Sequence, residues 1–338
     1  MSKRRVLALL AVLALAVLAG APLLGMGTMP LSVIWQPGGD TMEAEVFWRL
    51  RLPRVLLAFL AGAGLALGGM SFQALFRNAL ATPFTLGVAS GASLGAAVYV
   101  RLDLLSGKSG GLFLFLERLG VSLFALLGAL LAIGLVYGLS RARRGFSTST
   151  MLLAGVAISF FFSSLILFVQ YTSDFFNSFR ILRWLMGGLS GADYWTALSV
   201  LVFTCAGGLV LLYLSRELNL LATGEDLAAS RGVDVNRIKI ILFLAVSLMV
   251  GGIVAVCGPI GFVGLMCPHI CRLLIGPDHR HLMPATFLFG GVFLTLCDAV
   301  ARVLFAPTEM PVGVLTAFLG GPFFLWLLLR GASEKSIL

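Results

Sequence analysis

Residues 216–239 read RELNLLATGEDLAASRGVDVNRIK, and this charged stretch between two long apolar runs decides how the chain is folded. Apolar segments flank it on both sides for the width of a membrane, so we interpret it as a polar connection between two transmembrane helices. Of the 24 basic and 15 acidic residues in the chain, it holds eight: Arg216, Glu217, Glu225, Asp226, Arg231, Asp234, Arg237 and Lys239.

The local pattern within this stretch predicts two very short helices. Thr223, followed three residues later by Asp226, forms a capping-box pattern that predicts a helix start at Thr223. Gly232 stands where a left-handed residue ends a helix at low cost. Asp234 can then cap the next helix, which is predicted to run into the membrane. A rigid, capped, polar segment suits docking to a soluble partner, and a solvated connecting loop is the alternative.

The composition indicates a polytopic helical membrane protein. Hydrophobic residues make up 59% of the 338 residues and charged residues only 12%, against about 25% charged residues in soluble domains. No room is left for a soluble catalytic domain, so we expect an all-α fold with a single transmembrane domain, 1–338. Apolar runs predict ten spans, the first a retained helix rather than a signal peptide, at roughly 6–25, 55–76, 84–100, 119–140, 150–172, 194–214, 240–257, 258–275, 283–305 and 311–329.

The distribution of charge predicts the orientation. An even number of spans puts both termini on one side, and Lys3, Arg4 and Arg5 assign that side to the cytoplasm. With this topology the cytoplasmic segments hold fifteen basic and six acidic residues, and the outer segments hold nine of each, so the net charge of +9 lies on the inner side. This agreement supports the topology.

One group of basic residues goes against this trend, because it precedes the second span on the outer side: Arg49, Arg51 and Arg54. One explanation is internal pairing with the nearby acidic residues, which are Asp40, Glu43 and Glu45. The other is a basic outer surface that receives an acidic partner protein.

Three further segments have a recognisable pattern. Small residues crowd the third span, where Gly87, Gly91 and Gly95 recur at every fourth position, which predicts close helix packing, a role in lining a pathway, or both. Four hydroxyl residues at 147–150 open the fifth span, where they either cap the helix or form a polar constriction. Residues 173–195 are rich in aromatic side chains and predict a short helix along the outer surface.

The sequence contains no catalytic or nucleotide-binding pattern, so an enzyme is not expected. SGKS at 106–109 resembles the end of a phosphate-binding loop, but that pattern requires glycine where Leu102 stands. Ion-coupled carriers usually need an acidic residue within a span, and the only candidate is Asp298, late in the ninth. The energy source is therefore expected on another chain, and an autonomous secondary carrier or channel for a metal chelate is the alternative.

The cysteines lie in or beside apolar segments, and we interpret them as small buried side chains rather than disulfides. Cys267, His269 and Cys271 in the eighth span suggest a metal site. The two cysteines share one face of a helix, but His269 points away from it. We therefore predict no metal site and no cofactor bound by this chain.

Several longer motifs together resemble the FecCD/cobalamin-permease family, the permease subunits of ABC importers for iron-siderophores, haem and cobalamin. They are spread over most of the chain and read RLPRVLLAFLAGAGLALGGMSFQALFRNALATPFTLGVASGASLG (51–95), STSTMLLAGVAIS (147–159), GEDLAASRGVDVNRIK (224–239), GPIGFVGLMCPHICRLLIGPDHRHLMP (258–284) and DAVARVLFAPTEMPVGVLTAFLGGPFFLWLLL (298–329).

The resemblance implies the type II ABC importer permease fold and a set of partners. The expected assembly is a homodimer with a translocation path on its two-fold axis, in the lipid bilayer of the bacterial inner membrane. Two separate ATP-binding cassette subunits would bind ATP and Mg²⁺, and one periplasmic substrate-binding protein would dock outside. No nucleic acid is expected as a partner.

The resemblance also implies roles for individual residues. The segment that couples to the ATPase would comprise Gly224, Glu225, Asp226, Ala229, Arg231, Gly232, Val233, Asp234 and Arg237. The arginines that pair with carboxylates of the binding protein would be Arg51, Arg54 and Arg302. The cytoplasmic gate would be formed by Asn78, Leu80, Thr148 and Ser149.

Two positions depart from the family pattern. Ala79 stands where the family has proline, which puts the rigidity of the gate loop in question. Arg231 stands where an apolar residue is common, which bears on the choice of partner. A path lined by small and apolar residues suits a bulky chelate, but it does not choose among haem, siderophore and cobalamin.

Overall fold

The computed structural model describes residues 2–25, 29–35, 37, 39, 41–103, 111–142, 147–306 and 308–331, and these residues form helices and turns but no strand. Seven helical stretches are long and apolar enough to cross a membrane: Lys3–Leu23, Met42–Phe76, Gly120–Arg141, Thr148–Tyr171, Tyr194–Tyr213, Val235–Cys257 and His279–Val303. Three shorter apolar helices are Val88–Leu102, Val263–Ile275 and Val312–Leu327. All ten predicted spans therefore correspond to apolar helices, and the predicted all-α class is confirmed.

The helices are labelled in chain order. They are α1 Lys3–Gly20, η1 Ala21–Leu23, η2 Leu31–Trp35, α2 Met42–Glu45, η3 Val46–Arg51, α3 Leu52–Phe76, α4 Val88–Asp103, α5 Gly111–Ala142, α6 Thr148–Tyr171, α7 Phe175–Leu185, α8 Tyr194–Tyr213, α9 Ser215–Thr223, α10 Glu225–Ser230, α11 Val235–Cys257, α12 Val263–Ile275, α13 His279–Val303 and α14 Val312–Gly331.

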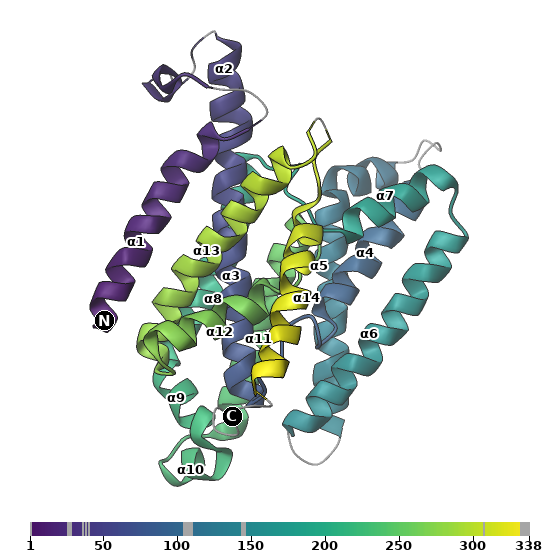
Figure 1. Cartoon of the computed structure of the whole chain (residues 1–338). Helices are drawn as coiled ribbons and strands as arrows, with labels where there is room; N and C mark the ends of the chain where they lie inside the picture. Colours follow the sequence, from purple (N-terminus) through teal and green to yellow (C-terminus); the bar gives the residue numbers. More distant parts are fainter. Residues whose placement is uncertain are drawn as a thin grey trace.

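The two ends of the bundle differ in what they carry (Figure 1). α9 and α10 project from one end, called here the α9–α10 end, and α2 and α7 lie at the opposite end. The first turn of α1 and the last turn of α14 both point toward the α9–α10 end. The short helix predicted within 173–195 is found as α7.

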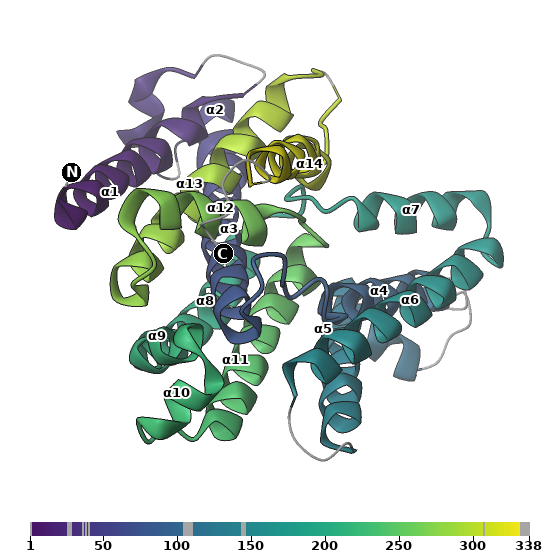
Figure 2. The ribbon, with the colours of Figure 1, turned by 60° about the horizontal axis from the view of Figure 1, so that its bottom comes forward.

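α3 is the centre of the larger group of helices and is buried along nearly its whole length. It packs against α8, α11, α12 and α13, which surround it in Figure 2. Small residues allow these close approaches. A methyl group at Gly62 would overlap the carbonyl oxygen of Gly290 in α13, and one at Gly69 would overlap that of Gly264 in α12.

α4, α5 and α6 form a second group, which α11 joins to the first by contacting α4 and α5 (Figure 2). The glycine repeat of the third span lies in this group. Gly91 and Gly95 in α4 face α5 so closely that added side chains would overlap the carbonyl oxygens of Gly128 and Phe124. Close helix packing, one of the two roles considered for the repeat, is therefore confirmed for Gly91 and Gly95, whereas Gly87 lies just before α4 with φ 81°.

α12 is a shortened membrane helix that begins later than predicted. Residues 258–262 before it are non-helical, and Phe262 has a left-handed backbone with φ 66°. Pro268, inside α12, has no amide hydrogen to donate to the carbonyl oxygen of Gly264. The side-chain amide of Gln73 in α3 donates to that oxygen instead, at 3.4 Å. A neighbouring helix thus satisfies the backbone group that the proline leaves free.

Candidate functional site

α9, α10 and the turn that leads into α11 form a polar projection, residues 215–234, called here the knuckle (Figure 1). The capping box predicted at Thr223 is wrong. Thr223 is the last residue of α9, and its hydroxyl donates to the carbonyl oxygen of Leu220 at 2.7 Å. Gly224 separates α9 from α10 with φ 136°, a backbone conformation that residues with a side chain rarely adopt, so glycine makes this corner without a side-chain cap.

The end of α10 agrees with the prediction. Gly232 has φ 83°, as expected for a left-handed helix stop. Its amide donates to the carbonyl oxygen of Ala229 at 2.9 Å, and the amide of Val233 donates to that of Ala228 at 3.1 Å, which is a Schellman motif. Asp234 then caps α11 and accepts a hydrogen bond from the first turn of that helix at 3.1 Å. The knuckle therefore has a defined shape.

The residues predicted to couple to an ATPase are gathered on the knuckle and its junction with α11. Sequence reasoning missed Leu227, which is 57% exposed on α10 and gives the knuckle an apolar contact point among its charges. An apolar residue within a short charged helix was the available signal. Of the predicted residues, Gly224, Glu225 and Val233 are half-buried, and the exposed ones are Asp226, Ala229, Arg231, Gly232, Asp234 and Arg237.

Two polar links fasten the underside of the knuckle to the membrane helices. Glu225 Oε2 lies 2.5 Å from Lys239 Nζ, and Lys239 in α11 is only 2% exposed. Asn219 in α9 accepts a hydrogen bond from the His279 amide at 2.9 Å and donates one to Asp278 at 2.8 Å. The bond from Asn219 lowers the pKa of Asp278, which caps α13.

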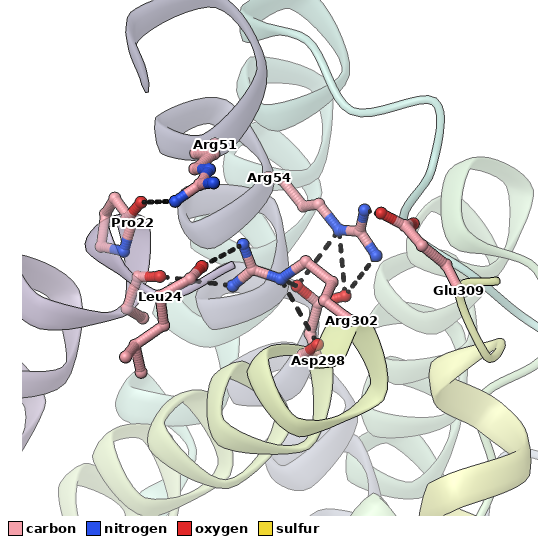
Figure 3. A network of polar contacts seen from close by, with 8 residues as sticks. Pro22, Leu24, Arg51, Arg54, Asp298, Arg302 and Glu309 are labelled. Carbon is pink, nitrogen blue, oxygen red and sulfur yellow. Dashed lines mark hydrogen bonds and ion pairs between the residues drawn. The ribbon is translucent and has the colours of Figure 1, made fainter. Parts of the chain in front are cut away.

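At the α2 end, the arginines predicted to dock a binding protein lie in one network with two acidic residues (Figure 3). Asp298 in α13 is 1% exposed and lies between two of these arginines. Arg54 Nη2 is 2.9 Å from Asp298 Oδ1, and Arg54 Nη1 is 2.8 Å from Glu309 Oε2. Arg302 Nε is 3.2 Å from Asp298 Oδ2. A buried carboxylate is thereby matched by two cations.

Backbone carbonyl oxygens after α1 complete this network (Figure 3). Arg302 donates to those of Ala21 and Leu24 at 3.3 and 3.2 Å, and Arg51 donates to that of Pro22 at 3.4 Å. Arginine suits these positions because its planar guanidinium group carries five donors in a fixed fork. The network joins the chain after α1 to η3, α3, α13 and the segment before α14.

The structure resolves the question of internal pairing among the outer arginines only in part. Arg49 does pair with Glu45, at 2.9 Å. Arg54 is paired as well, but with Asp298 and a residue near α14 rather than with the acidic residues that precede it in sequence. Asp40, one of the two other acidic residues considered as partners, lies outside the described residues.

Sequence reasoning missed the part that Asp298 and Glu309 play in this network. The spacing of four residues between Asp298 and Arg302 on one helix was the available signal for the first. Glu309 had none, because its partner is 255 positions away. Arg302 is 5% exposed and the Arg54 side chain 14%, and their docking role stays a prediction.

Asn78 and Leu80, two of the predicted gate residues, lie in the loop that follows α3 at the α9–α10 end (Figure 1). The Asn78 side chain accepts a hydrogen bond from the Leu80 amide at 2.9 Å, and the Asn78 carbonyl accepts one from the Ala81 amide at 3.1 Å. This turn, closed by an asparagine side chain, orders the loop without the proline that Ala79 replaces. Leu80 is 57% exposed.

Thr148 and Ser149, the other two gate residues, begin α6 at the same end (Figure 1). Ser147 is the N-cap residue, whose side chain accepts a hydrogen bond from the Thr150 amide at 3.2 Å. The capping explanation for this hydroxyl run is therefore confirmed at Ser147. Thr148 is half-buried and Ser149 is exposed, and a gate between two copies of the chain stays a prediction.

The residues considered for a metal site do not converge. Cys267 and Cys271 are buried free thiols, whereas the half-buried His269 packs edge-to-face on Phe323 in α14, with ring centroids 6.1 Å apart. Within the part of the chain that the structure describes, no three His, Cys, Asp or Glu side chains are grouped to hold a metal ion. The SGKS stretch lies outside the described residues.

Comparison with known proteins identifies relatives along nearly the whole chain. The model of the FecCD transport family matches residues 8–330. The hemin transport system permease protein of Yersinia pestis is 37% identical to this chain, and the alignment covers 98% of each protein. The vitamin B12 import system permease protein of Salmonella paratyphi A is 42% identical over 88% of this chain and 89% of the relative. A solved inward-facing structure of an ABC transporter described as metal-chelate type has a TM-score of 0.84 and 32% identity, covering 97% of this chain and 99% of that one.

Proposed function

Because this chain belongs to the FecCD transport family, we propose that it is the permease subunit of an ATP-driven importer that moves an iron chelate (siderophore or haem) or cobalamin from periplasm to cytoplasm. Its relatives include a hemin permease and a vitamin B12 permease. The observation that carries the proposal is the knuckle, a projecting pair of short helices tied to two membrane helices. An autonomous carrier has no need of such a docking element.

ATP and Mg²⁺ bind to two separate ATPase subunits, and this chain supplies the surface on which each one docks. The exposed residues of α10 and the turn after it contact a cleft on the ATPase, with Leu227 as the apolar contact. Gly224 and Val233 shape the two ends of α10 beneath that surface. Arg231, exposed at the C-terminal end of α10, adds a positive charge that selects an ATPase with an acidic cleft.

A second copy of the chain completes the translocation path. Asn78 and Leu80 lie in one loop and Thr148 and Ser149 on one helix end, and Leu80 and Ser149 are exposed on the single chain. These four residues and their symmetry mates form a ring that closes the cytoplasmic end of the path. Short side chains suffice, because even a ring that leaves a small central opening stops a bulky chelate.

A periplasmic binding protein docks at the α2 end through carboxylates that face the arginines there. Arg54 pairs with both Asp298 and Glu309, and Arg302 pairs with Asp298. Arg51 and Arg54 make the contact, and the more deeply buried Arg302 supports it from below.

The chain is a multi-pass protein of the bacterial inner membrane with both termini in the cytoplasm, as the charge distribution favours.

The test is uptake into proteoliposomes that contain the permease with its cognate ATPase and binding protein. Labelled haem, a ferric siderophore and cobalamin are offered separately, with ATP inside the vesicles. We expect uptake of one of the three that requires ATP, the ATPase and the binding protein. Uptake without the ATPase, driven by an ion gradient, would refute the proposal in favour of a secondary carrier.

Docking at the α2 end is tested separately by measuring the affinity of the binding protein for the reconstituted permease at low salt. Arg51→Glu should weaken that affinity, because like charges then face each other. Reversal of the partner's facing carboxylate should restore it. An affinity unchanged by Arg51→Glu would show that this cluster serves only the internal network.

A further inference from the structure

α10 is a hinged element by its backbone alone. It is six residues long, and it lies between two glycine corners, Gly224 with φ 136° and Gly232 with φ 83°. In the described part of the chain, the main packing partners of α10 are its neighbours in sequence, α9 and α11. A short helix between two such corners can swing unless a further contact fixes its angle to the membrane helices.

The Glu225–Lys239 pair is such a contact, in addition to Ala228, which α10 buries in the hydrophobic core. Glu225 is the first residue of α10, directly after the Gly224 corner, and Lys239 lies in α11 beyond the Gly232 corner. Their 2.5 Å ion pair therefore bridges the two ends of the hinged element. The Lys239 side chain is 2% exposed, and a buried ammonium group requires a partner that compensates for its lost hydration. The pair is thus held in place by the burial of one member.

The second link fixes α9 in the same way. Asn219 Oδ1 accepts from the His279 amide at 2.9 Å and lies 2.7 Å from His279 Nδ1, which must be the donor because an amide oxygen only accepts. Asn219 Nδ2 donates to Asp278, the N-cap residue of α13. One asparagine side chain therefore joins α9 to the first turn of α13.

We propose that Glu225, Lys239 and Asn219 are positioning residues that make the knuckle a rigid extension of α11 and α13. This inference rests on the proposed coupling to an ATPase. When the ATPase moves the knuckle, the ion pair carries the displacement to α11 and the asparagine carries it to α13. Without these links, α10 follows the ATPase by rotating at its glycine corners, and the membrane helices do not move.

The experiment measures transport per ATP hydrolysed in the full reconstituted complex. Glu225→Gln should lower this ratio about tenfold, which corresponds to ~1.4 kcal/mol of coupling free energy. The double variant Glu225→Gln/Lys239→Met leaves no buried charge, so it should fold and be uncoupled to the same extent. Exchange of the charges, Glu225→Lys with Lys239→Glu, should restore coupling. Glu45→Gln, which removes an exposed ion pair at the α2 end, is the matched control.

The outcomes separate this inference from the proposed function. A wild-type complex without ATP-dependent uptake overturns both. A wild-type complex that transports, together with a double variant whose transport per ATP stays within about twofold of wild type, overturns only the positioning role. A fall in ATPase affinity with an unchanged transport-to-ATP ratio also overturns it, because the pair would then shape the docking surface alone.

Discussion

Replacing Asp298 by asparagine should destabilise the protein strongly. The Asp298 side chain is 1% exposed, and it compensates Arg54 and Arg302, whose side chains are 14% and 6% exposed. Removing one partner of a buried ion pair costs about 3–5 kcal/mol, because the remaining charge is left without compensation. Arg54 keeps Glu309, whereas the partners that Arg302 keeps among the described residues are backbone carbonyl oxygens. We therefore expect a cost near the lower limit, about 3 kcal/mol.

A double-mutant cycle isolates the Asp298–Arg302 interaction. Arg302→Met alone leaves Asp298 paired with Arg54, and the double variant removes both charges of the pair. The double variant should therefore cost less than the sum of the two single variants, by about 0.5–3 kcal/mol. The free energy of unfolding is measured by equilibrium titration with sodium dodecyl sulfate in mixed micelles, followed by the fluorescence of the 5 tryptophans.

The control is Glu45→Gln, which breaks an ion pair whose side chains are 61% and 76% exposed. It should change the unfolding free energy by less than about 1 kcal/mol, because water screens exposed pairs. If Asp298→Asn costs no more than this control, the network is not a source of stability and the reasoning from burial is wrong.

Three further predictions concern separate parts of the chain. Gly232→Val places a β-branched residue at φ 83° at a cost of about 1–2 kcal/mol, so the ATPase should bind more weakly in an affinity measurement; unchanged affinity contradicts this. Thr148→Trp should block ATP-driven uptake while dimerisation survives, and Thr148→Cys should give an intersubunit crosslink in at least one nucleotide state, or the gate lies elsewhere. Asp193 caps α8, and the Thr196 amide at 2.7 Å holds its pKa below the ordinary 3.8. Its contribution to stability is complete above pH 3.8 and is lost as the pH falls through the lowered pKa. Hydrogen exchange in the first turn of α8, corrected for its intrinsic rate, should therefore accelerate only in acid, whereas Asp193→Ala should exchange fast at every pH.

The features that sequence analysis predicted are those that depend on neighbouring residues or on the membrane. Apolar runs located all ten spans, and seven of the described helices are long enough to cross the bilayer. Gly232 was recognised as a helix stop, because glycine has little cost at positive φ. The same local reasoning placed a cap at Thr223, where glycine at the next position took over the corner instead. A capping pattern competes with any adjacent residue that can turn the backbone.

The features that were missed depend on contacts between distant parts of the chain. The partners of Arg54 are 244 and 255 positions away, and those of Gln73 in α12 are 191, 192 and 199 positions away. No periodicity or spacing signals such pairs in one sequence. Asp298 was considered only as an exception to an apolar span, although a buried carboxylate requires a cation close by.

The shortened α12 has a consequence for how the protein is made. Its 13 residues span about 20 Å, less than the ~30 Å of hydrocarbon, and the non-helical 258–262 before it cannot face lipid. α14 covers this break, with Gly313 against Pro259 and Gly320 against the ring of Phe262. Since α14 is synthesised after α12, a nascent chain holds this non-helical backbone without the cover of α14 until that helix has entered the bilayer. Chains that stop before 312 leave this backbone without the cover of α14.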